Sequence, residues 1–229
     1  MTFKIITENT PSLTPLESAA LQQLKRQGGT SNFKVTKRYY KFSGKTFDEA
    51  FKNMKIAAAK VIKDKTASGE QSIGLTIWSI DRSAYNKIRF GGTKSRLLAY
   101  PVGLTVQAKI EVILPQWTEV EVSTTEDKNK WKKLFDGLNK HEQVHVCIAL
   151  AAFNEIKQKF LGISGSGKTN QAANTDLNNK VPTIFSNIIA DTKIKQKKYD
   201  DTDNGLKETE QAEYDKQITT ECDAKYPKQ

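Results

Sequence analysis

The chain contains only two histidines, and they lie four residues apart in the pattern His141-Glu142-x-x-His145. Residues four apart lie on one face of an α-helix, so both imidazoles can point toward one position in space. Such pairs are typical of zinc sites, in which each nitrogen lies about 2.0–2.1 Å from the metal. Glu142 lies beside them, where it can accept a proton from a water that the metal activates. The pattern predicts a metal site, and its alternative is two histidines that pack on a buried helix.

The residues around this motif favour a helix. Apolar residues and the histidines recur at spacings of three and four, as on one helical stripe: Trp131, Leu134, Leu138, His141 and His145. The helix is predicted to begin in the polar stretch 123–127 and to end at Leu161, with either a break or bend near Gly137 or a frayed first part. The motif therefore lies in the middle of a long helical region.

Strands are predicted before this region and helices after it. Runs with alternating or β-rich composition indicate strands over residues 32–43, 73–80, 85–90, 96–100 and 104–114, the last ending at Pro115, and a helix over 47–63 follows the cap Thr46. Later helices are predicted over 171–198, with a kink or a new start at Pro182, and over 206–220 after an acidic turn. This order predicts an α+β fold, with a mostly antiparallel N-terminal sheet and a helical half that carries the histidines. We expect residues 1–30 to form an N-terminal segment and residues 31–221 a single domain.

The composition excludes some classes of function. The net charge is +10, but the lysines are scattered and no nucleic-acid motif accompanies them, so we expect a solvated surface and no nucleic-acid partner. The longest apolar run, residues 146–153, is far shorter than the roughly 20 residues that cross a bilayer, so no transmembrane segment is predicted. No signal peptide is visible. The two cysteines, Cys147 and Cys222, are compatible with one disulfide or with two unrelated thiols.

A second motif competes with the histidines. The segment that begins at Gly162 and ends at Thr169 matches the phosphate-binding pattern G-x-x-x-x-G-K-[ST]. That loop works between a buried strand and a helix, so that backbone amides bind the phosphates. Here the preceding residues belong to the tail of the histidine helix, so we interpret the segment as a hinge between helices. A nucleotide-binding protein is the less favoured alternative.

A zinc site with two histidines needs a third protein ligand, and without another histidine a carboxylate is the natural choice. Glu155 lies ten residues beyond His145 on the same helix, which is about 15 Å away by the rise per residue. Asp200 and Asp203 follow a helix that can return to the site. We therefore favour one of these two aspartates.

Further residues complete a resemblance to a known family. They are Tyr39-Tyr40, Gly44-Lys-Thr46, Trp78, Leu114-Pro-x-Trp117, Trp131, the histidine motif and Tyr199-Asp-x-x-Thr202-x-x-Gly205. Over about residues 33–211 the chain resembles the bacterial domain of unknown function 922 family, whose members are presumed to be zinc-dependent proteases. The resemblance implies a zincin-like, secreted or periplasmic (cell-envelope) protein.

The chain departs from the family pattern at Asn204, where a histidine is common. If that histidine is a ligand or a transition-state donor, its function is either weakened here or taken over by a neighbour, and Asp200 is then the best candidate for the third ligand. Tyr199 would then supply a hydroxyl that stabilises a developing oxyanion. The alternative is that Tyr199 packs and Asp200 caps the last helix.

We therefore expect a zinc metallopeptidase that acts on a peptide or protein substrate. His141, His145 and Asp200 would hold Zn²⁺, and Glu142 would be the general base. Residues 110–114 are expected to form the sheet edge on which an extended substrate pairs. The alternative is a catalytically degenerate protein of the same fold that binds metal or a partner, and the oligomeric state is left open.

Overall fold

The computed structural model describes residues 31–62, 72–85, 87–93 and 95–203. In chain order the elements are β1 (Ser31–Phe42), α2 (Phe47–Val61), β2 (Leu75–Arg82), β3 (Lys87–Thr93), β4 (Arg96–Val102), β5 (Val106–Trp117), the 3-10 turn η1 (Val120–Val122), α3 (Thr125–Leu161), β6 (Gly165–Gly167) and α4 (Asn170–Asp203). The strands and one helix precede the two long helices, so the predicted α+β class is confirmed. The predicted segment 1–30 and the predicted helix 206–220 lie outside the described residues.

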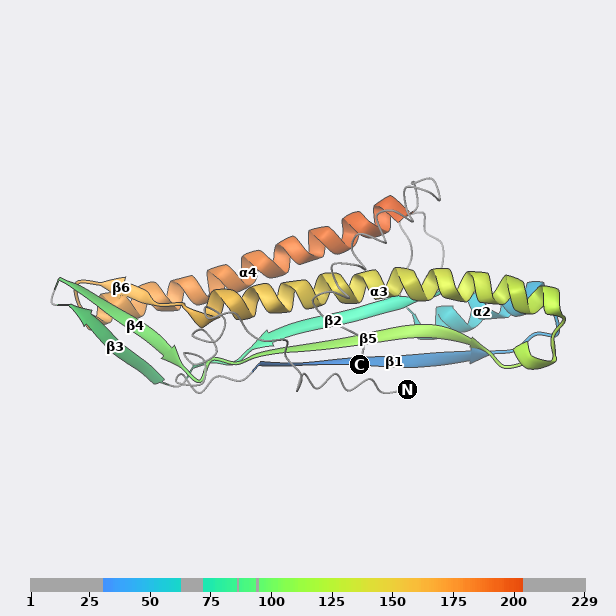
Figure 1. The fold of residues 1–229 in the computed structure, drawn as a ribbon, viewed down its shortest axis with the longest axis horizontal. Coiled ribbons are helices and arrows are strands. Elements are labelled where there is room, and N and C mark those ends of the chain that lie inside the picture. Colours follow the sequence, from blue (N-terminus) through green and yellow to red (C-terminus); the bar gives the residue numbers. More distant parts are fainter. Residues whose placement is uncertain (1–30, 63–71, 86, 94, 204–229) are drawn as a thin grey trace, which may run out of the picture.

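The strands form two three-stranded sheets, with the orders β1-β5-β2 and β3-β4-β6. β5 pairs in parallel with β1 and antiparallel with β2, and the pairs of the smaller sheet are antiparallel. The sheets lie one after the other along the long axis of the molecule, and α3 and α4 run beside them (Figure 1). The β1–β5 pair is thus the one parallel pair among the described strands.

The position of β5 corrects one prediction. Residues 110–114 lie in the centre of the larger sheet, because β1 and β2 occupy both sides of β5. Among the described strands, β1 and β2 form the free edges of this sheet. The alternation along β5 shows which of its faces is buried, but such a pattern does not tell which strands flank it. β5 also continues through Pro115 to Trp117, because one missing N–H donor does not end a twelve-residue strand.

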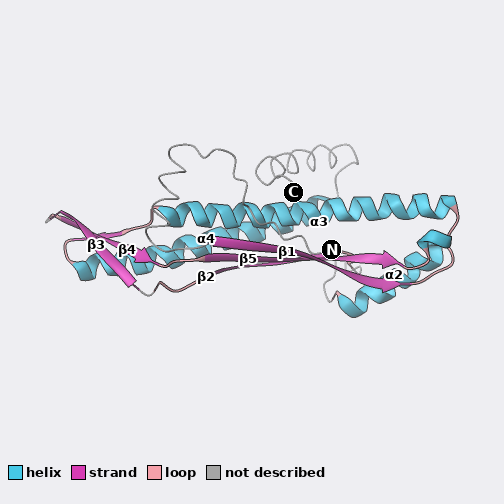
Figure 2. Ribbon diagram, turned by 60° about the horizontal axis from the view of Figure 1, so that its bottom comes forward, coloured by secondary structure: helices cyan, strands magenta, loops and turns pink. Residues whose placement is uncertain are grey.

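α3 covers one face of the larger sheet. Alternate residues of β5, from Val106 to Val112, are buried as predicted, and Ile110 packs with Ala149 and Leu150 of α3. α2 lies at the end of the sheet where β1 and β5 finish (Figure 2). Its N-terminus is capped by Thr46, whose hydroxyl accepts a hydrogen bond from the Glu49 amide at 3.3 Å, as predicted.

Both long helices are continuous, so neither the predicted break near Gly137 nor the predicted new start at Pro182 is present. α3 runs without a break through Gly137, because one exposed glycine costs only about 1 kcal/mol relative to alanine in a helix of this length. α4 contains Pro182 and extends to Asp203, so the acidic turn predicted after Lys198 is helical in its described part. Leu177 and Val181 are fully buried on the first half of α4, which anchors the helix against the proline penalty of about 3 kcal/mol.

Candidate metal centre

The predicted histidine pair lies in the middle of α3. The Nε2 atoms of His141 and His145 are 3.0 Å apart, so both rings point toward one position, as the spacing of four predicts. His145 is 7% exposed, whereas the side chain of His141 is 21% exposed. The pair therefore lies at the boundary between the protein interior and solvent.

α4 places Asp200 against both histidines. One carboxylate oxygen, Oδ1, lies 2.8 Å from Nε2 of His145 and 3.4 Å from Nε2 of His141. The three residues form a group whose ligand atoms all lie within 4.8 Å of one another. Of the other candidates, Glu155 is exposed on the following turns of α3 and lies outside this group, and the side chain of Asp203 is not described.

This group fits a tetrahedral metal ion. Bonds of about 2.0–2.1 Å in tetrahedral geometry separate two ligand atoms by about 3.3 Å. The observed separations of 2.8, 3.0 and 3.4 Å are close to that spacing. Two imidazoles and one carboxylate are a common donor set for catalytic zinc. The side chain of Asp200 is 54% exposed, so the group is accessible from its side.

Gln196 holds His145 from the side away from the cluster. Its Oε1 contacts Nδ1 of His145, and its amide nitrogen donates to the His145 carbonyl at 3.0 Å. A hydrogen bond from Nδ1–H leaves the Nε2 lone pair directed at the cluster, which is the tautomer that a metal needs. Gln196 was not among the residues predicted from the sequence. Its spacing of four from Asp200 on the same helix face is the signal that could have revealed it.

Glu142 is buried, at 3% exposure, and is held by a strand. The hydroxyl of Thr76 on β2 donates to Oε2 of Glu142 at 2.7 Å. Burial raises the pKa of Glu142, and the hydrogen bond from Thr76 offsets only part of that effect. A side chain at Gly74 would place a Cβ atom 2.7 Å from Oε1 of Glu142, so glycine is needed for this close approach. No local pattern points to Thr76 in the sequence.

Asp200 has the opposite electrostatic environment. Burial alone would raise its pKa, but the protonated forms of His141 and His145 donate hydrogen bonds to the carboxylate and add positive charge, and together these effects outweigh burial. The pKa of Asp200 therefore lies well below its usual range, and the carboxylate is ionised at neutral pH. The neutral histidine tautomer with an Nε2 lone pair is instead the form that would bind a metal. An ionised carboxylate is the form that binds a metal ion.

Tyr199 reaches the same cluster. Its side chain is 1% exposed, and its ring centroid lies 4.9 Å from that of His141 and 5.1 Å from that of His145. The ring therefore packs against both imidazoles and restricts their rotation. The role that we predicted for its hydroxyl stays a prediction.

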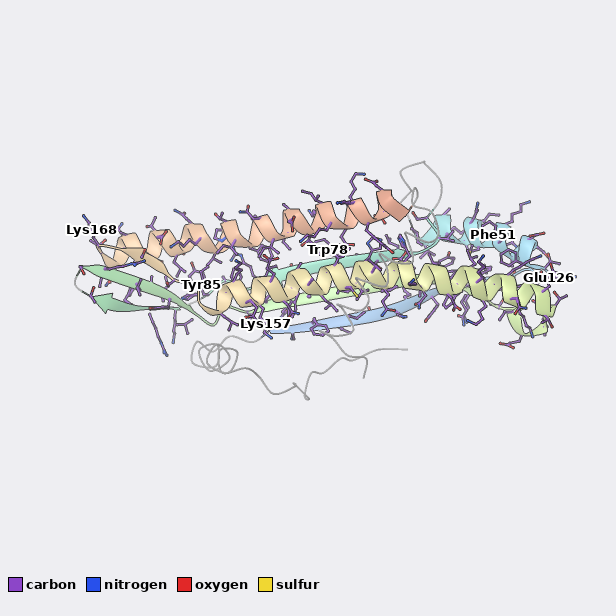
Figure 3. The ribbon with its side chains drawn as sticks, turned by 45° about the horizontal axis from the view of Figure 1, so that its top comes forward. Phe51, Trp78, Tyr85, Glu126, Lys157 and Lys168 are labelled. Carbon is purple, nitrogen blue, oxygen red and sulfur yellow. The ribbon has the colours of Figure 1, made fainter. Side chains whose placement is uncertain are left out.

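The segment that matches a phosphate-binding loop has another structure. Gly165–Gly167 form β6, which pairs with β4, so the segment is neither the predicted hinge nor a loop after a parallel strand. A Cβ atom at Gly165 would lie 2.0 Å from the carbonyl oxygen of Ala173, so glycine allows β6 to pack against α4. Lys168 lies at the end of the molecule opposite Glu126, which stands at the start of α3 (Figure 3).

Two further predictions can be compared with the described residues. Cys147, two residues after His145, is buried and disulfide-bonded, and Cys222 lies outside the described residues. Within the described ranges, no helix has the length and apolar character that crossing a bilayer requires.

Comparison with known proteins places the chain in a family. Residues 37–209 match the model of a family described as "Bacterial protein of unknown function (DUF922)". No curated protein and no solved structure matches the chain. The matched span covers most of the chain and includes Thr76, the three motif residues of α3 and Asp200. The chain therefore belongs to the DUF922 family of bacterial proteins of unknown function.

Proposed function

We propose that the protein is a zinc-dependent metallopeptidase. The observation that carries this proposal is the convergence of His141, His145 and Asp200 beside a buried carboxylate that is not itself part of the cluster. Two histidines and one carboxylate, with an accessible fourth position, make up the ligand set of zinc peptidases. The proposal agrees with the resemblance noted for the sequence.

The residues around the cluster have separate roles. A zinc ion held there would supply Lewis acidity, which lowers the pKa of a water molecule and polarises a peptide carbonyl. Glu142 accepts the proton of the attacking water and later passes it to the leaving amine, and its raised pKa makes it a stronger base than an exposed carboxylate. Thr76 holds one oxygen of Glu142 and so orients the other.

Two residues of α4 support this chemistry. Gln196 fixes the ring of His145 through contacts with Nδ1 and with the backbone carbonyl. We assign to the hydroxyl of Tyr199 the stabilisation of the oxyanion that forms when water attacks the carbonyl. The packing of its ring against both imidazoles supports this assignment.

We also propose that the protein works outside the cytoplasm, in the cell envelope or as a secreted protein. The disulfide at Cys147 supports this location, because disulfides persist mainly in oxidising compartments.

A catalytically degenerate metal-binding protein is the second candidate. Asn204 favours it, because the family that the sequence resembles commonly has a histidine at this position. Both candidates bind metal, so only a measurement of hydrolysis separates them.

The proposal is tested by measuring zinc content and peptide hydrolysis on the same preparations. Elemental analysis should find about one zinc per chain in the wild type and in Glu142→Gln, and almost none in His145→Ala. With a quenched-fluorescent peptide library, Glu142→Gln should lower the rate of hydrolysis by about 10²–10⁴-fold, because the general base is lost.

The remaining outcomes separate the candidates. Zinc without hydrolysis in the wild type would support the degenerate protein. Absence of zinc after dialysis against the metal would contradict both. Hydrolysis that persists in Glu142→Gln would remove Glu142 from the mechanism, whatever the metal content.

A further inference from the structure

A cavity of about 750 Å³ lies between β2 and α4. Six consecutive residues of β2, residues 75–80, form one wall, and Phe185, Ile189 and Lys193 of α4 are on the other. These three are spaced by four residues, so they form one stripe of the helix. We call this cavity the β2–α4 groove.

The groove follows the free edge of β2. Successive side chains of a strand point to opposite faces, so a cavity that touches six consecutive residues must run along the edge of the strand. Among the described strands, β2 pairs with β5 alone. Every second amide and carbonyl of β2 therefore points away from β5, as they do in a sheet edge that can accept another strand.

The groove approaches the candidate metal centre at two points. Thr76 lines the groove and holds Glu142 through its hydroxyl. On α4, Lys193 is seven residues before Asp200, which corresponds to about 10 Å along the helix. A chain bound in the groove would therefore extend toward the residues that carry the proposed chemistry.

The wall of the groove is mainly apolar. Ile77 is 48% exposed on β2, although it is a large aliphatic residue, and Phe185 and Ile189 are only partly buried on α4. Trp78, which Figure 3 labels on β2, also lines the groove. An aliphatic side chain placed against this wall would be removed from water, which favours its binding.

We propose that the β2–α4 groove binds the peptide substrate as an added strand on β2 and prefers apolar side chains, which would pack against Phe185 and Ile189 on the face of Trp78 and against Ile77 on the opposite face. This inference rests on the proposed peptidase function and names its substrate class. Main-chain hydrogen bonds to the edge of β2 give affinity, and the apolar wall gives selectivity.

The test measures binding, with Glu142→Gln as the parent protein so that peptides are held but not hydrolysed. The probes are end-blocked, fluorescein-labelled heptapeptide pools whose central residue is fixed as Leu, Gly or Lys, and the readout is fluorescence anisotropy. The Leu pool should bind at least about tenfold more tightly than the Gly pool, because tenfold corresponds to 1.4 kcal/mol, less than the value of a fully buried Leu.

Two substitutions of the same kind locate the site. Ile77→Asp should weaken binding of the Leu pool by at least about tenfold, because it places a charge in the apolar wall. Ile194→Asp is the matched control, because Ile194 is 66% exposed on α4 and does not line the groove. Phe185→Ala removes the opposite wall and should weaken the same pool if Ile77→Asp proves to unfold the protein.

N-methylation of the best peptide tests the strand pairing. In a strand, alternate amides face the partner, so methylation of every second amide should weaken binding and methylation of the others should not. Equal losses at neighbouring amides, or no loss at any amide, would overturn strand addition. The peptide proposal would be overturned if no pool binds. It would also be overturned if sedimentation shows a dimer that Ile77→Asp converts to monomers, because the groove would then bind a second copy of the chain.

Hydrolysis by the zinc-loaded wild-type protein separates this inference from the proposed function. Peptides could bind with losses at every second methylated amide while the wild type hydrolyses none of them. That result would support strand addition in the groove and contradict the peptidase function. If Ile77→Asp and Phe185→Ala leave the rate of hydrolysis unchanged, the peptidase function stands and the groove is not the substrate-binding site.

Discussion

The two helices that form the candidate metal centre contribute to it in different ways. α3 supplies His141, Glu142 and His145, and α4 supplies Gln196, Tyr199 and Asp200, so each helix provides three residues within five positions. The residues of α3 form a recognisable motif because two ligands of one metal come from a single helix face. The residues of α4 reach the histidines only because α4 packs against α3. Local spacing thus specifies half of the site, and tertiary packing specifies the other half.

The two carboxylates show how this difference in packing sets their chemistry. Glu142 lies under β2, where burial raises its pKa. Asp200 is 54% exposed and contacts both histidines, which keep its pKa well below the usual range. The same functional group is therefore suited to accept a proton on α3 and to bind a cation on α4.

The largest effect is expected from removing the ligand that α4 contributes. Asp200→Ala should weaken zinc binding by more than about 100-fold, because loss of a ligand exceeds the 10–100-fold effect of losing a residue that only supports one. Competition with a chromophoric chelator measures this affinity. The matched control is Asp191→Ala on the same helix, where the aspartate is paired with Lys195 at 2.6 Å on the surface. Equal affinities for the two variants would exclude Asp200 as a ligand.

A smaller effect is expected from the residue of α4 that supports a ligand of α3. Gln196→Leu keeps much of the side-chain volume but removes both contacts with His145, so zinc affinity should fall by about 10–100-fold. Gln158→Leu, at an exposed position of α3, should leave the affinity unchanged. A loss of stability in Gln196→Leu without a loss of zinc affinity would show that Gln196 joins the helices but does not orient the ring.

Thr76→Val should change the pH dependence of hydrolysis more than its maximum rate. The hydroxyl of Thr76 stabilises the Glu142 carboxylate, so its removal raises the pKa of Glu142 further. The base is then protonated up to a higher pH, and the acidic limb of the kcat/KM profile should move to higher pH. Above that limb the rate should fall by less than about tenfold, because the base itself is retained.

The control for this substitution is Thr118→Val, which removes a hydroxyl that likewise donates to a glutamate carboxylate, that of Glu119 at 2.6 Å, but lies away from the site. The role of Thr76 in stabilising the Glu142 carboxylate would be contradicted if the acidic limb of the kcat/KM profile does not move in Thr76→Val. It would also be contradicted if the limb moves equally in both variants.

The parts of this structure that could be predicted from the sequence are those set by local patterns. The strand alternation, the cap at Thr46 and the histidine pair all depend on residues within a few positions of one another. The edge position of residues 110–114 was predicted wrongly because sheet order depends on pairing between distant segments. Thr76 and Gln196 were missed for the same reason, since each contacts the motif from another element.

The breaks that we expected in the long helices were also judged locally. A glycine at position 137 lowers intrinsic helix stability, but α3 is held by packing on both sides of it. Leu134 packs against the buried cluster that includes Ala50 and Met54 of α2, and Val144 is fully buried. Propensities are small compared with such packing, so they do not decide where a helix ends.

Gly137→Ala gives the smallest of the expected effects and tests whether α3 is continuous there. A Cβ atom at this position meets no atom within 4 Å, and residue 137 is exposed, so the substitution should stabilise the protein by about 0.5–1 kcal/mol through helix propensity alone. Urea unfolding measures the change, and Gly74→Ala is the opposite control, because its Cβ would lie 2.7 Å from Glu142 and Leu138. Destabilisation by Gly137→Ala would mean that α3 bends at this residue.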